Sequence, residues 1–405
     1  MSLTILQGIH RIQEFPSPVT RGRELKAILV SCYEFHYDIR FKYVRSILEE
    51  RGFQVKMLFS NFDHLKKQEI SYHEPGIIRI KVPAYQKNIS VKRLYSHIIF
   101  SYKLRKVLKM EKPDLIFADI PPNTIAGSVA WYKGKNRECK VIFDVLDLWP
   151  ESFSSSKVLK VPFWFWMRIR TQALPKADAV TLECDYYKHF LEECLKGNPY
   201  SILYLCKPPL EEELQFSHES FHEKSALNFC YLGSMNNIIN IPAITKMLTT
   251  IQQKRPVKVY LIGDGERREF FIRQLKKKGM DVEYLGLVFD ENLKNDVFRK
   301  CHFGINMYND NVMIGLTMKS LDYFRVGLPT VNMNIYDTGI LVEDYQSGFN
   351  LSRKSWNEVI EDIVTIQEEG WNSLHENTIK MFQEKFSEAV FRNNFNQVLE
   401  RCGIK

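Results

Sequence analysis

Short apolar segments of strand length alternate with helical segments along most of this chain, and this alternation limits the folds that it can adopt. Residues 25–31 (LKAILVS) form an apolar run, residues 41–50 have helical character and end at Arg51-Gly52, and residues 53–59 (FQVKMLF) form a second apolar run. Two strands joined by a helix lie parallel in one sheet, because the crossover returns the chain to the edge where it started. The alternation therefore predicts parallel sheets covered by helices, an α/β fold.

The alternation occurs in two blocks. Further strands are expected at 76–82, 114–118, 140–144, 179–183 and 201–205 in the first block, and at 227–232, 257–262, 282–285 and 303–307 in the second. Residues 206–225 contain a Pro-Pro pair, a cluster of acids and little apolar periodicity, which are features of a linker. We therefore expect two doubly wound, Rossmann-like domains facing a central cleft. They comprise residues 1–205 (acceptor-binding) and 227–383 (nucleotide-sugar-binding), with a linker at 206–226 and a C-terminal helix within 384–405 that packs back on the first domain.

The composition is that of a globular protein of two-domain size. The chain has 405 residues, of which 45% are apolar and 26% are charged, and one domain takes roughly 150 residues. The longest apolar run, residues 161–167 (VPFWFWM), is far shorter than the ~20 residues that span a bilayer. The N-terminal residues lack the features of a signal peptide, and the eight scattered cysteines contain no C-x-x-C pair. A cytoplasmic enzyme with reduced thiols is expected.

Two segments are candidates for contact with a membrane. Residues 91–112 contain seven Lys or Arg and one acid, and they place Leu94, Ile98, Leu104 and Leu108 on an expected apolar stripe. A basic amphipathic helix of this kind binds an anionic membrane surface or a phosphate-bearing acceptor, or it is an ordinary solvated helix face. The aromatic run at 161–167 is either a second membrane contact or, as we favour, an amphipathic helix buried under the first sheet. Nucleic acid is disfavoured because no recognition motif accompanies the charge.

The segment at residues 315–331 (GLTMKSLDYFRVGLPTV) has the features of a helix that begins at a phosphate. Thr317 is a suitable N-cap, Gly327 ends a helix over 318–326, and Pro329 prevents its continuation before an apolar strand. The N-terminus of a helix carries unpaired N–H groups and about half a positive charge, which suits a diphosphate. Lys319 adds a charge in the first turn. Asp322, one turn later, can accept hydrogen bonds from a sugar or ribose hydroxyl.

An ordered set of motifs accompanies this segment. In the second half these are residues 231–234 (YLGS), 262–265 (IGDG), 284–288 (YLGLV), Met318-Lys319, Asp322-Tyr323 and residues 327–331 (GLPTV). Residues 48–55 (LEERGFQV) and 144–152 (DVLDLWPES) add to them in the first half. Together these motifs resemble those of GT-B glycosyltransferases, specifically the retaining family 4, and the resemblance covers nearly the whole chain.

The resemblance implies a donor site for a nucleotide sugar in the second domain. The residues that would line the nucleoside are Gly263, Asp264, Gly265, Leu287 and Val288. Asp322 takes the position of the family's glutamate that holds the ribose hydroxyls, and a carboxylate suits that role because it accepts several hydrogen bonds. The residues that would meet the diphosphate are Thr317, Met318 and Lys319 from one side, and Gly233 and Ser234 from the other.

The sequence departs from the family pattern at three places. The first glutamate of the family's E-x7-E motif falls on Ile314, with Asp310 as the nearest acid. Residues 235–239 lack the usual Arg and Lys, so Lys319 would carry more of the phosphate neutralisation. Leu146 stands where many relatives have a histidine.

Asp147 is the leading polar candidate on the acceptor side, with Glu151 second. A carboxylate between the domains can accept the proton of the incoming hydroxyl or orient that hydroxyl. Alternatively, Asp147 caps the next segment. The expected catalytic residues are therefore Asp147 and Lys319.

The chain contains no D-x-D motif and no His/Cys cluster with zinc spacing, so no metal and no cofactor is expected. The sequence predicts a metal-independent glycosyltransferase that moves a sugar from a nucleotide sugar, UDP-linked, to a lipid-linked or oligosaccharide acceptor. Its place would be polysaccharide biosynthesis at the inner face of the membrane, and retention of configuration follows from the resemblance only. Two alternatives stay open: a non-catalytic relative that binds a partner transferase, and a GT-B-like nucleotide-sugar epimerase. A dinucleotide-dependent oxidoreductase is disfavoured, because no G-x-G-x-x-G opens a first helix.

Overall fold

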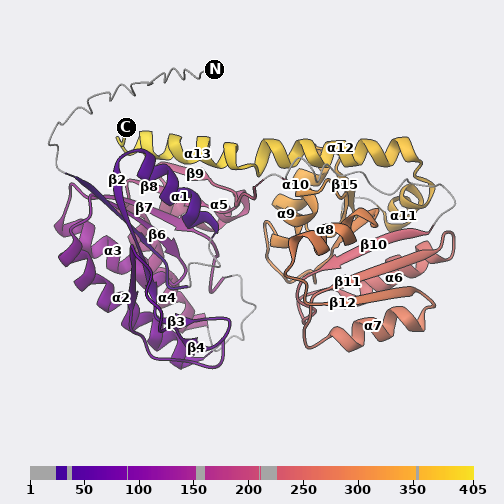
Figure 1. Cartoon of the computed structure of the whole chain (residues 1–405), viewed down its shortest axis with the longest axis horizontal. Coiled ribbons are helices and arrows are strands. Elements are labelled where there is room, and N and C mark those ends of the chain that lie inside the picture. The colour runs from indigo at the N-terminus through magenta and orange to yellow at the C-terminus, as the bar shows by residue number, and fades with distance from the viewer. Residues whose placement is uncertain are drawn as a thin grey trace, which may run out of the picture.

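The structure is a computed structural model that describes residues 24–33, 39–88, 90–151, 160–208, 210, 226–352 and 355–405. Two α/β halves lie side by side, each built on a parallel sheet (Figure 1). The expected linker at 206–226 falls largely outside the described residues.

The first half contains a seven-stranded sheet in the order β5-β2-β1-β6-β7-β8-β9. Its strands are β1 (Leu25–Val30), β2 (Phe53–Ser60), β5 (Ile77–Ile80), β6 (Leu115–Ile120), β7 (Lys140–Val145), β8 (Ala179–Leu182) and β9 (Tyr200–Ile202). A short hairpin of β3 (Phe62–Asp63) and β4 (Gln68–Glu69) follows β2. The central strand β6 is buried at all six positions, which is typical of a parallel strand covered by helices on both faces.

The helices of the first half are α1 (Ile39–Glu50), α2 (Val91–Glu111), α3 (Asn123–Lys135), α4 (Lys160–Ala173) and α5 (Lys188–Leu195), with 3-10 turns at Leu174–Lys176 and Asp185–Tyr187. The buried face of α2 passes through His97, Phe100, Leu104 and Leu108, whereas Ile98 is exposed. The expected apolar stripe is therefore wrong at Ile98. Positions 98 and 104 are six residues apart, which places them on different faces of a helix with 3.6 residues per turn.

The aromatic run at 161–167 lies in α4, and the expectation that this helix is buried is wrong. Trp164 and Phe165 are 48% and 60% exposed, whereas Phe163 and Trp166 are partly buried and pack edge-on against Trp149. Four consecutive aromatic residues point around a helix in different directions, so a single buried stripe cannot accommodate all of them.

The second half contains a six-stranded sheet in the order β12-β11-β10-β13-β14-β15. Its strands are β10 (Leu227–Leu232), β11 (Val257–Ile262), β12 (Asp281–Gly286), β13 (Phe303–Asn306), β14 (Thr330–Asn332) and β15 (Gly348–Asn350). Its helices are α6 (Ile241–Gln252), α7 (Arg268–Lys277), α8 (Glu291–Arg299), α9 (Met318–Arg325), α10 (Asp337–Asp344), α11 (Trp356–Thr365) and α12 (Glu368–Lys385).

The last helix, α13 (Glu388–Arg401), belongs to the core of the first half. Figure 1 shows α12 and α13 end to end across the top of both halves. The Phe395 ring packs on Phe117 of β6, with the ring centroids 5.5 Å apart, while Phe382 of α12 packs in the core of the second half. The helix expected at 384–400 is thus divided, because its first two residues end α12 and Ser387 caps α13.

The chain passes between the halves at one place. After β9 it leaves the first half at Lys207, and after α12 it returns through Phe386 and Ser387. The Lys207 backbone N–H donates to the Phe386 carbonyl, at 3.2 Å, and Lys207 pairs with Ser387 in a parallel bridge. The two crossings are therefore hydrogen-bonded to each other.

The α/β fold with two parallel Rossmann-like sheets is confirmed. Ligands of such sheets bind beyond the carboxyl ends of the strands, so the site is expected there. Among the described helices, none combines the length and the apolar character needed to cross a bilayer.

Candidate active site

Helix α9 begins and ends as the sequence predicts. The Thr317 hydroxyl accepts a hydrogen bond from the Ser320 backbone N–H, which caps the helix, and Gly327 follows its end with a φ of +67°. Met318, the first helical residue, is half exposed and lines a cavity whose other walls come from the first half. The N-terminus of α9 therefore faces the space between the two sheets.

The Lys319 side chain lies under this helix start in an aromatic environment. Its Nζ is 4.1 Å from the centroid of the Tyr231 ring and 4.7 Å from that of Tyr308. Lys319 is only 7% exposed, and Nζ has no hydrogen-bond partner among the described residues. Burial lowers the pKa of Lys319 from 10.5 to about 7. An anion bound nearby would favour the charged form.

The two glycine-containing loops that were expected at the donor pack against each other at the ends of β10 and β11. Gly233 N–H donates to the Ile262 carbonyl and Met235 N–H to the Asp264 carbonyl, both at 2.9 Å. A Cβ on Gly263 would lie 2.0 Å from the Gly233 oxygen, and one on Gly265 would lie 2.5 Å from the Met235 oxygen. The close packing of the two loops is thus enough by itself to require glycine at positions 263 and 265, without a bound nucleoside.

Other expected donor residues lie on or beside these loops. The Gly263 N–H donates to the Gly286 carbonyl at 2.7 Å, which brings exposed Leu287 and partly buried Val288 next to the Gly263–Gly265 loop. The Asp264 carboxylate accepts from Arg268, at 3.1 Å. A Cβ on Gly233 would lie 3.9 Å from Lys319 Cε. These contacts link the loops to one another and to Lys319. Ser234 takes no part in them and is exposed.

Asp322 lies in an ion-pair network. Its side chain is 12% exposed, and Oδ1 contacts the ammonium groups of Lys207 and, at 3.3 Å, Lys294. Lys294 also pairs with Glu291, which pairs with Arg325. A ribose hydroxyl bound at Asp322, as expected, would therefore share the carboxylate with two lysines.

On the acceptor side, Asp147 follows β7 and lines a cavity of about 590 Å³. The walls of this apolar cavity come from the start of α2, the Pro121-Pro122 pair, Trp149 and Phe163. Glu151, the second acidic candidate, pairs with Arg170, which is fully buried. Both oxygens of the Glu151 carboxylate accept hydrogen bonds from Arg170.

The interdomain cavity, of about 400 Å³, adjoins the apolar cavity. Tyr33, Arg93 and Leu146 line both cavities. Residues just beyond the ends of β1, β7 and β8 line the interdomain cavity from one side, and Met318 lines it from the other. Asp147 and the start of α9, predicted from separate motifs, are thus brought to the same region.

A group of contacts centred on Asp337 holds the halves together beside this region. Asp337, at the start of α10, accepts hydrogen bonds from the backbone N–H groups of Asp185 (2.7 Å) and Tyr186 (2.9 Å) and from the Tyr204 hydroxyl (2.9 Å). The Tyr186 and Tyr336 rings stack with their centroids 3.7 Å apart. We call these contacts the Asp337 clasp.

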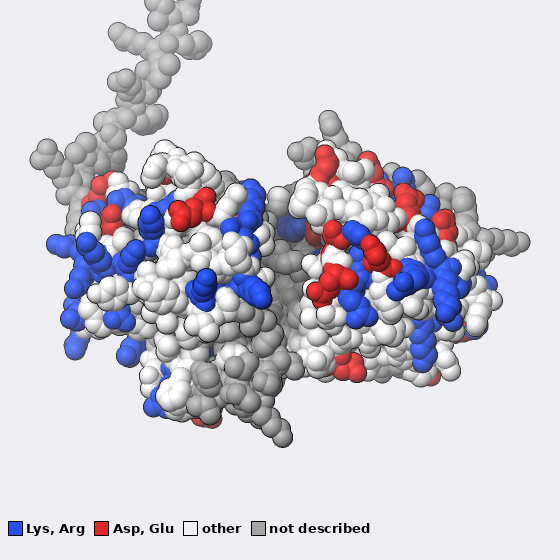
Figure 2. All heavy atoms as spheres, turned by 90° about the horizontal axis from the view of Figure 1, so that it is seen from below, with Lys and Arg blue, Asp and Glu red and all other residues white. Residues whose placement is uncertain are grey.

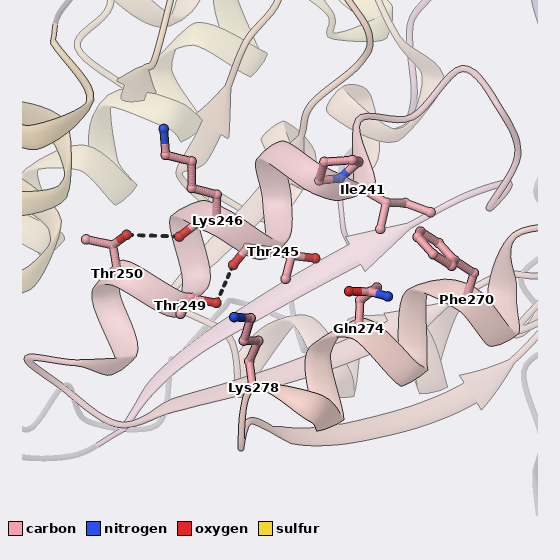
Figure 3. A pocket seen from close by; sticks show the side chains of 9 residues that line it. Ile241, Thr245, Lys246, Thr249, Thr250, Phe270, Gln274 and Lys278 are labelled. Carbon is pink, nitrogen blue, oxygen red and sulfur yellow. Dashed lines mark hydrogen bonds between the residues drawn. The ribbon is translucent and has the colours of Figure 1, made fainter.

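A further hollow, of about 380 Å³, lies between α6 and α7 (Figure 3). No residue expected at the site lines it. The hydroxyls of Thr249 and Thr250 donate to carbonyls of their own helix, as Figure 3 shows. The hollow is therefore a groove between two helices, lined in part by the polar side chains of Thr245, Gln274 and Lys278.

Sequence reasoning missed several residues of this region. Tyr231 and Tyr308 surround Lys319, and Lys207 and Lys294 neutralise Asp322. Only Tyr231 stood in a quoted motif, and an aromatic residue in a strand usually indicates core packing. Arg93, which lines both cavities, was present only as one charge of the basic segment.

Comparisons with known proteins concern the second half of the chain and the overall fold. Residues 226–369 match the family described as Glycosyl transferases group 1, whereas no curated protein matches the chain. Among solved structures, sucrose-phosphate synthase from Thermosynechococcus elongatus aligns with a TM-score of 0.67 at 13% identity, covering 93% of this chain and 98% of that one. HepE from Anabaena, in complex with UDP-glucose, aligns with a TM-score of 0.62 at 14% identity over 93% and 99%.

A third structure, WaaG, a glycosyltransferase involved in lipopolysaccharide biosynthesis, aligns with a TM-score of 0.61 at 11% identity over 93% and 100%. At these identities the structural likeness establishes the fold, which is GT-B. The matched domain supplies the class, and the protein is a glycosyltransferase of the GT-B fold with a group 1 domain in its second half.

Proposed function

We propose that the protein transfers a sugar from a UDP-sugar to a lipid-linked or oligosaccharide acceptor, with retention of configuration and without a metal ion. The observation that carries the proposal is the position of the α9 N-terminus, which lines one cavity with the strand ends of the first sheet. A donor whose diphosphate meets α9 would present its sugar toward that cavity. HepE, a structural neighbour, was solved in complex with UDP-glucose, which supports uridine as the base.

In this proposal the residues of α9 stabilise the leaving diphosphate. The backbone N–H groups after Thr317 point out of the helix start, and Lys319 lies in the first turn. Preorganised donors of this kind stabilise developing charge without rearrangement. Asp147, across the adjoining cavity, would orient the acceptor hydroxyl or receive its proton.

We further propose that α2 contacts an anionic membrane surface. Val91, Tyr95, Ile98 and Tyr102 are exposed and recur at helical spacing, and Lys103, Lys106 and Lys109 continue the exposed face. Figure 2 shows Lys and Arg spread over the first half, with uncharged surface between them and some Asp and Glu along its upper edge. Apolar residues with basic neighbours are the features of an interfacial helix, and Trp164 and Phe165 of α4 add exposed aromatic surface.

The first experiment is a calorimetric titration of the full chain with UDP, GDP, ADP and TDP and their common sugars, with and without Mg²⁺ or EDTA. Binding of UDP that persists in EDTA is the expected result, and product analysis should then find free UDP together with a glycosylated acceptor. A new nucleotide sugar without free UDP would identify an epimerase instead. The absence of binding by any nucleotide would overturn the donor site and favour a non-catalytic partner protein.

A further inference from the structure

His64 lines the interdomain cavity from the short hairpin that follows β2. It comes directly after β3, and its half-buried side chain shares the cavity wall with Met318 of α9. Leu146, at the position where many relatives have a histidine, lines the same cavity but has no polar side-chain atom. The chain thus places an imidazole in this cavity from an element that the quoted motifs do not include.

Two tyrosines hold the His64 ring. Its Nδ1 lies 2.7 Å from the Tyr85 hydroxyl oxygen, and the ring meets the Tyr33 ring edge-on with the centroids 5.3 Å apart. Tyr85 is 4% exposed, and the Tyr33 hydroxyl accepts a hydrogen bond from Arg93 at 2.8 Å. Because both tyrosines are themselves held, these contacts fix the orientation of the imidazole.

The surroundings of the ring determine which nitrogen carries its hydrogen. Burial and the charges of Arg93 and Lys67 lower the pKa of His64 from 6.5 to about 4, so the ring is neutral near pH 7 and has one N–H group. The Arg93 charge also acts on Tyr85, and it favours the orientation in which the hydroxyl oxygen faces this cation and the hydrogen faces Nδ1. We therefore assign Nδ1 as the acceptor and Nε2–H as a donor.

This donor is accessible from the cavity. His64 Nε2 has no hydrogen-bond partner among the described residues, yet it is not buried. Arg40 and Asp119 also line the cavity but are each 1% exposed, whereas Glu183, just beyond β8, is partly exposed. A ligand therefore meets an uncharged N–H donor from the hairpin and a carboxylate acceptor from the end of β8. Sugar hydroxyls, which both donate and accept, suit such a pair.

The volume of the cavity restricts the ligand to a single sugar ring. At roughly 30 Å³ for each water-sized group, the cavity of about 400 Å³ holds about thirteen such groups. That is close to the number of non-hydrogen atoms in one hexosyl group and too small for a disaccharide. Because Met318 at the start of α9 lines this cavity, a diphosphate bound at the helix start would place its sugar here.

We infer that His64 Nε2–H donates a hydrogen bond to a hydroxyl group of the donor sugar, and that this contact contributes to the choice of sugar. The inference rests on the proposed transferase function and specifies a sugar-contacting residue of its donor site. Tyr85 is a positioning residue, because it acts on the sugar only through the imidazole that it orients.

The test uses the full chain in calorimetric titrations with UDP, UDP-glucose, UDP-galactose and UDP-N-acetylglucosamine. His64→Phe, which keeps an aromatic ring, should weaken binding of the UDP-sugar preferred by the wild type about fivefold, the effect of one uncharged hydrogen bond. Its UDP affinity should be unchanged, which also shows that the variant is folded. His64→Gln, which retains a side-chain N–H group, should recover most of the loss, and Tyr85→Phe should have an intermediate effect. His73→Phe, at an exposed position between β4 and β5, is the control and should bind all four compounds as the wild type does.

Monodeoxy analogues of the preferred UDP-sugar identify the hydroxyl group. The analogue that lacks the hydroxyl contacted by His64 should bind equally to the wild type and to His64→Phe, whereas the other analogues should still distinguish the two proteins. Equal binding of the UDP-sugar by wild type and His64→Phe would overturn this inference, as would equal losses of affinity for UDP and the UDP-sugar. Absence of UDP binding by the wild type would instead refute the proposed function.

Discussion

At the scale of single residues, Lys319 combines a stability cost with the donor-site role that we propose for it. Its ammonium lies between the Tyr231 and Tyr308 rings without a hydrogen-bond partner among the described residues. Burying a charge without full compensation destabilises the fold, and such sites commonly coincide with function.

The pKa of Lys319, lowered to about 7, predicts how donor affinity depends on pH. The protonated form binds a diphosphate, so the Lys319 contribution to UDP affinity should level off about one unit below pH 7. Above pH 7 it should fall by up to tenfold per unit, because binding must then take up a proton. Lys319→Met should lose most of the affinity and the pH dependence, as calorimetry between pH 6.5 and 9 would show. A pH-independent wild type would contradict this assignment.

The same variant should be more stable than the wild type by on the order of 1 kcal/mol. In the folded state Lys319 is charged only below about pH 7, whereas the unfolded chain keeps the charge to about pH 10.5. The folded state therefore carries the full penalty below pH 7, and the penalty is lost as the pH rises toward 10.5. The gain from Lys319→Met, measured by denaturant unfolding, should be larger at pH 6 than at pH 9.

Asp322 gives a second prediction at this scale. Asp322→Asn leaves the partly buried ammonium groups of Lys207 and Lys294 without their shared carboxylate, which should destabilise the protein by about 2 kcal/mol, somewhat less than for a fully buried pair. Glu49→Gln, which breaks the exposed pair with Arg45, is the control and should cost at most about 0.5 kcal/mol. Equal effects in denaturant unfolding would show that the Asp322 network contributes no more than a surface pair.

Residue-scale prediction from the sequence succeeded where the signal is local. The Thr317 cap depends on neighbours three residues apart, so the sequence contains it. The two lysines of Asp322 come from the segment after β9 and from α8, which lie 115 and 28 residues away. No local pattern brings them together, so the sequence did not show that the carboxylate expected at the ribose also pairs with two lysines.

At the scale of elements, the loops after β10 and β11 fit together only through glycine. Gly263 has a φ of +131°, and a Cβ would meet the Gly233 backbone at 2.0 Å. Gly263→Ala should destabilise the protein by about 3 kcal/mol or more, since both strain and overlap oppose it. Gly134→Ala, in the last turn of α3 with no atom within 4 Å of the new Cβ, should instead stabilise by about 0.5–1 kcal/mol. Thermal unfolding of the two variants, with their opposite signs, checks the loop packing.

The strands of both sheets could be predicted because each is a short apolar run between turn signals. Residues 227–232 and 257–262 match β10 and β11 at both ends. The elements between residue 332 and the final helix were missed, namely the three-residue strand β15 and the helices α10 to α12. β15 exists because β14 offers a free edge, which is a tertiary cause. The division of the last helix likewise reflects a change of packing partner at Phe386.

At the scale of the whole molecule, the Asp337 clasp sets how closely the halves approach. Asp337→Asn puts an amide NH₂ group among three donors, so the two backbone N–H groups and the Tyr204 hydroxyl lose an ionic acceptor, at a cost of about 2 kcal/mol. We expect a larger radius of gyration by solution scattering and a lower turnover. Asp344→Asn, exposed at the other end of α10, should change neither. An unchanged radius of gyration in Asp337→Asn would show that other contacts hold the halves closed.

The packing of α13 on the first sheet has a consequence for how the protein is made. Phe391 and Phe395 complete the core around Phe41 and Phe117, yet they are synthesised after every strand of the second half. Domains of a nascent chain generally fold in the order in which they leave the ribosome. Here the first half emerges first, but the part of its sheet that α13 covers beside α1 stays uncovered until the last helix appears. All residues of the second core are therefore synthesised before those that complete the first core.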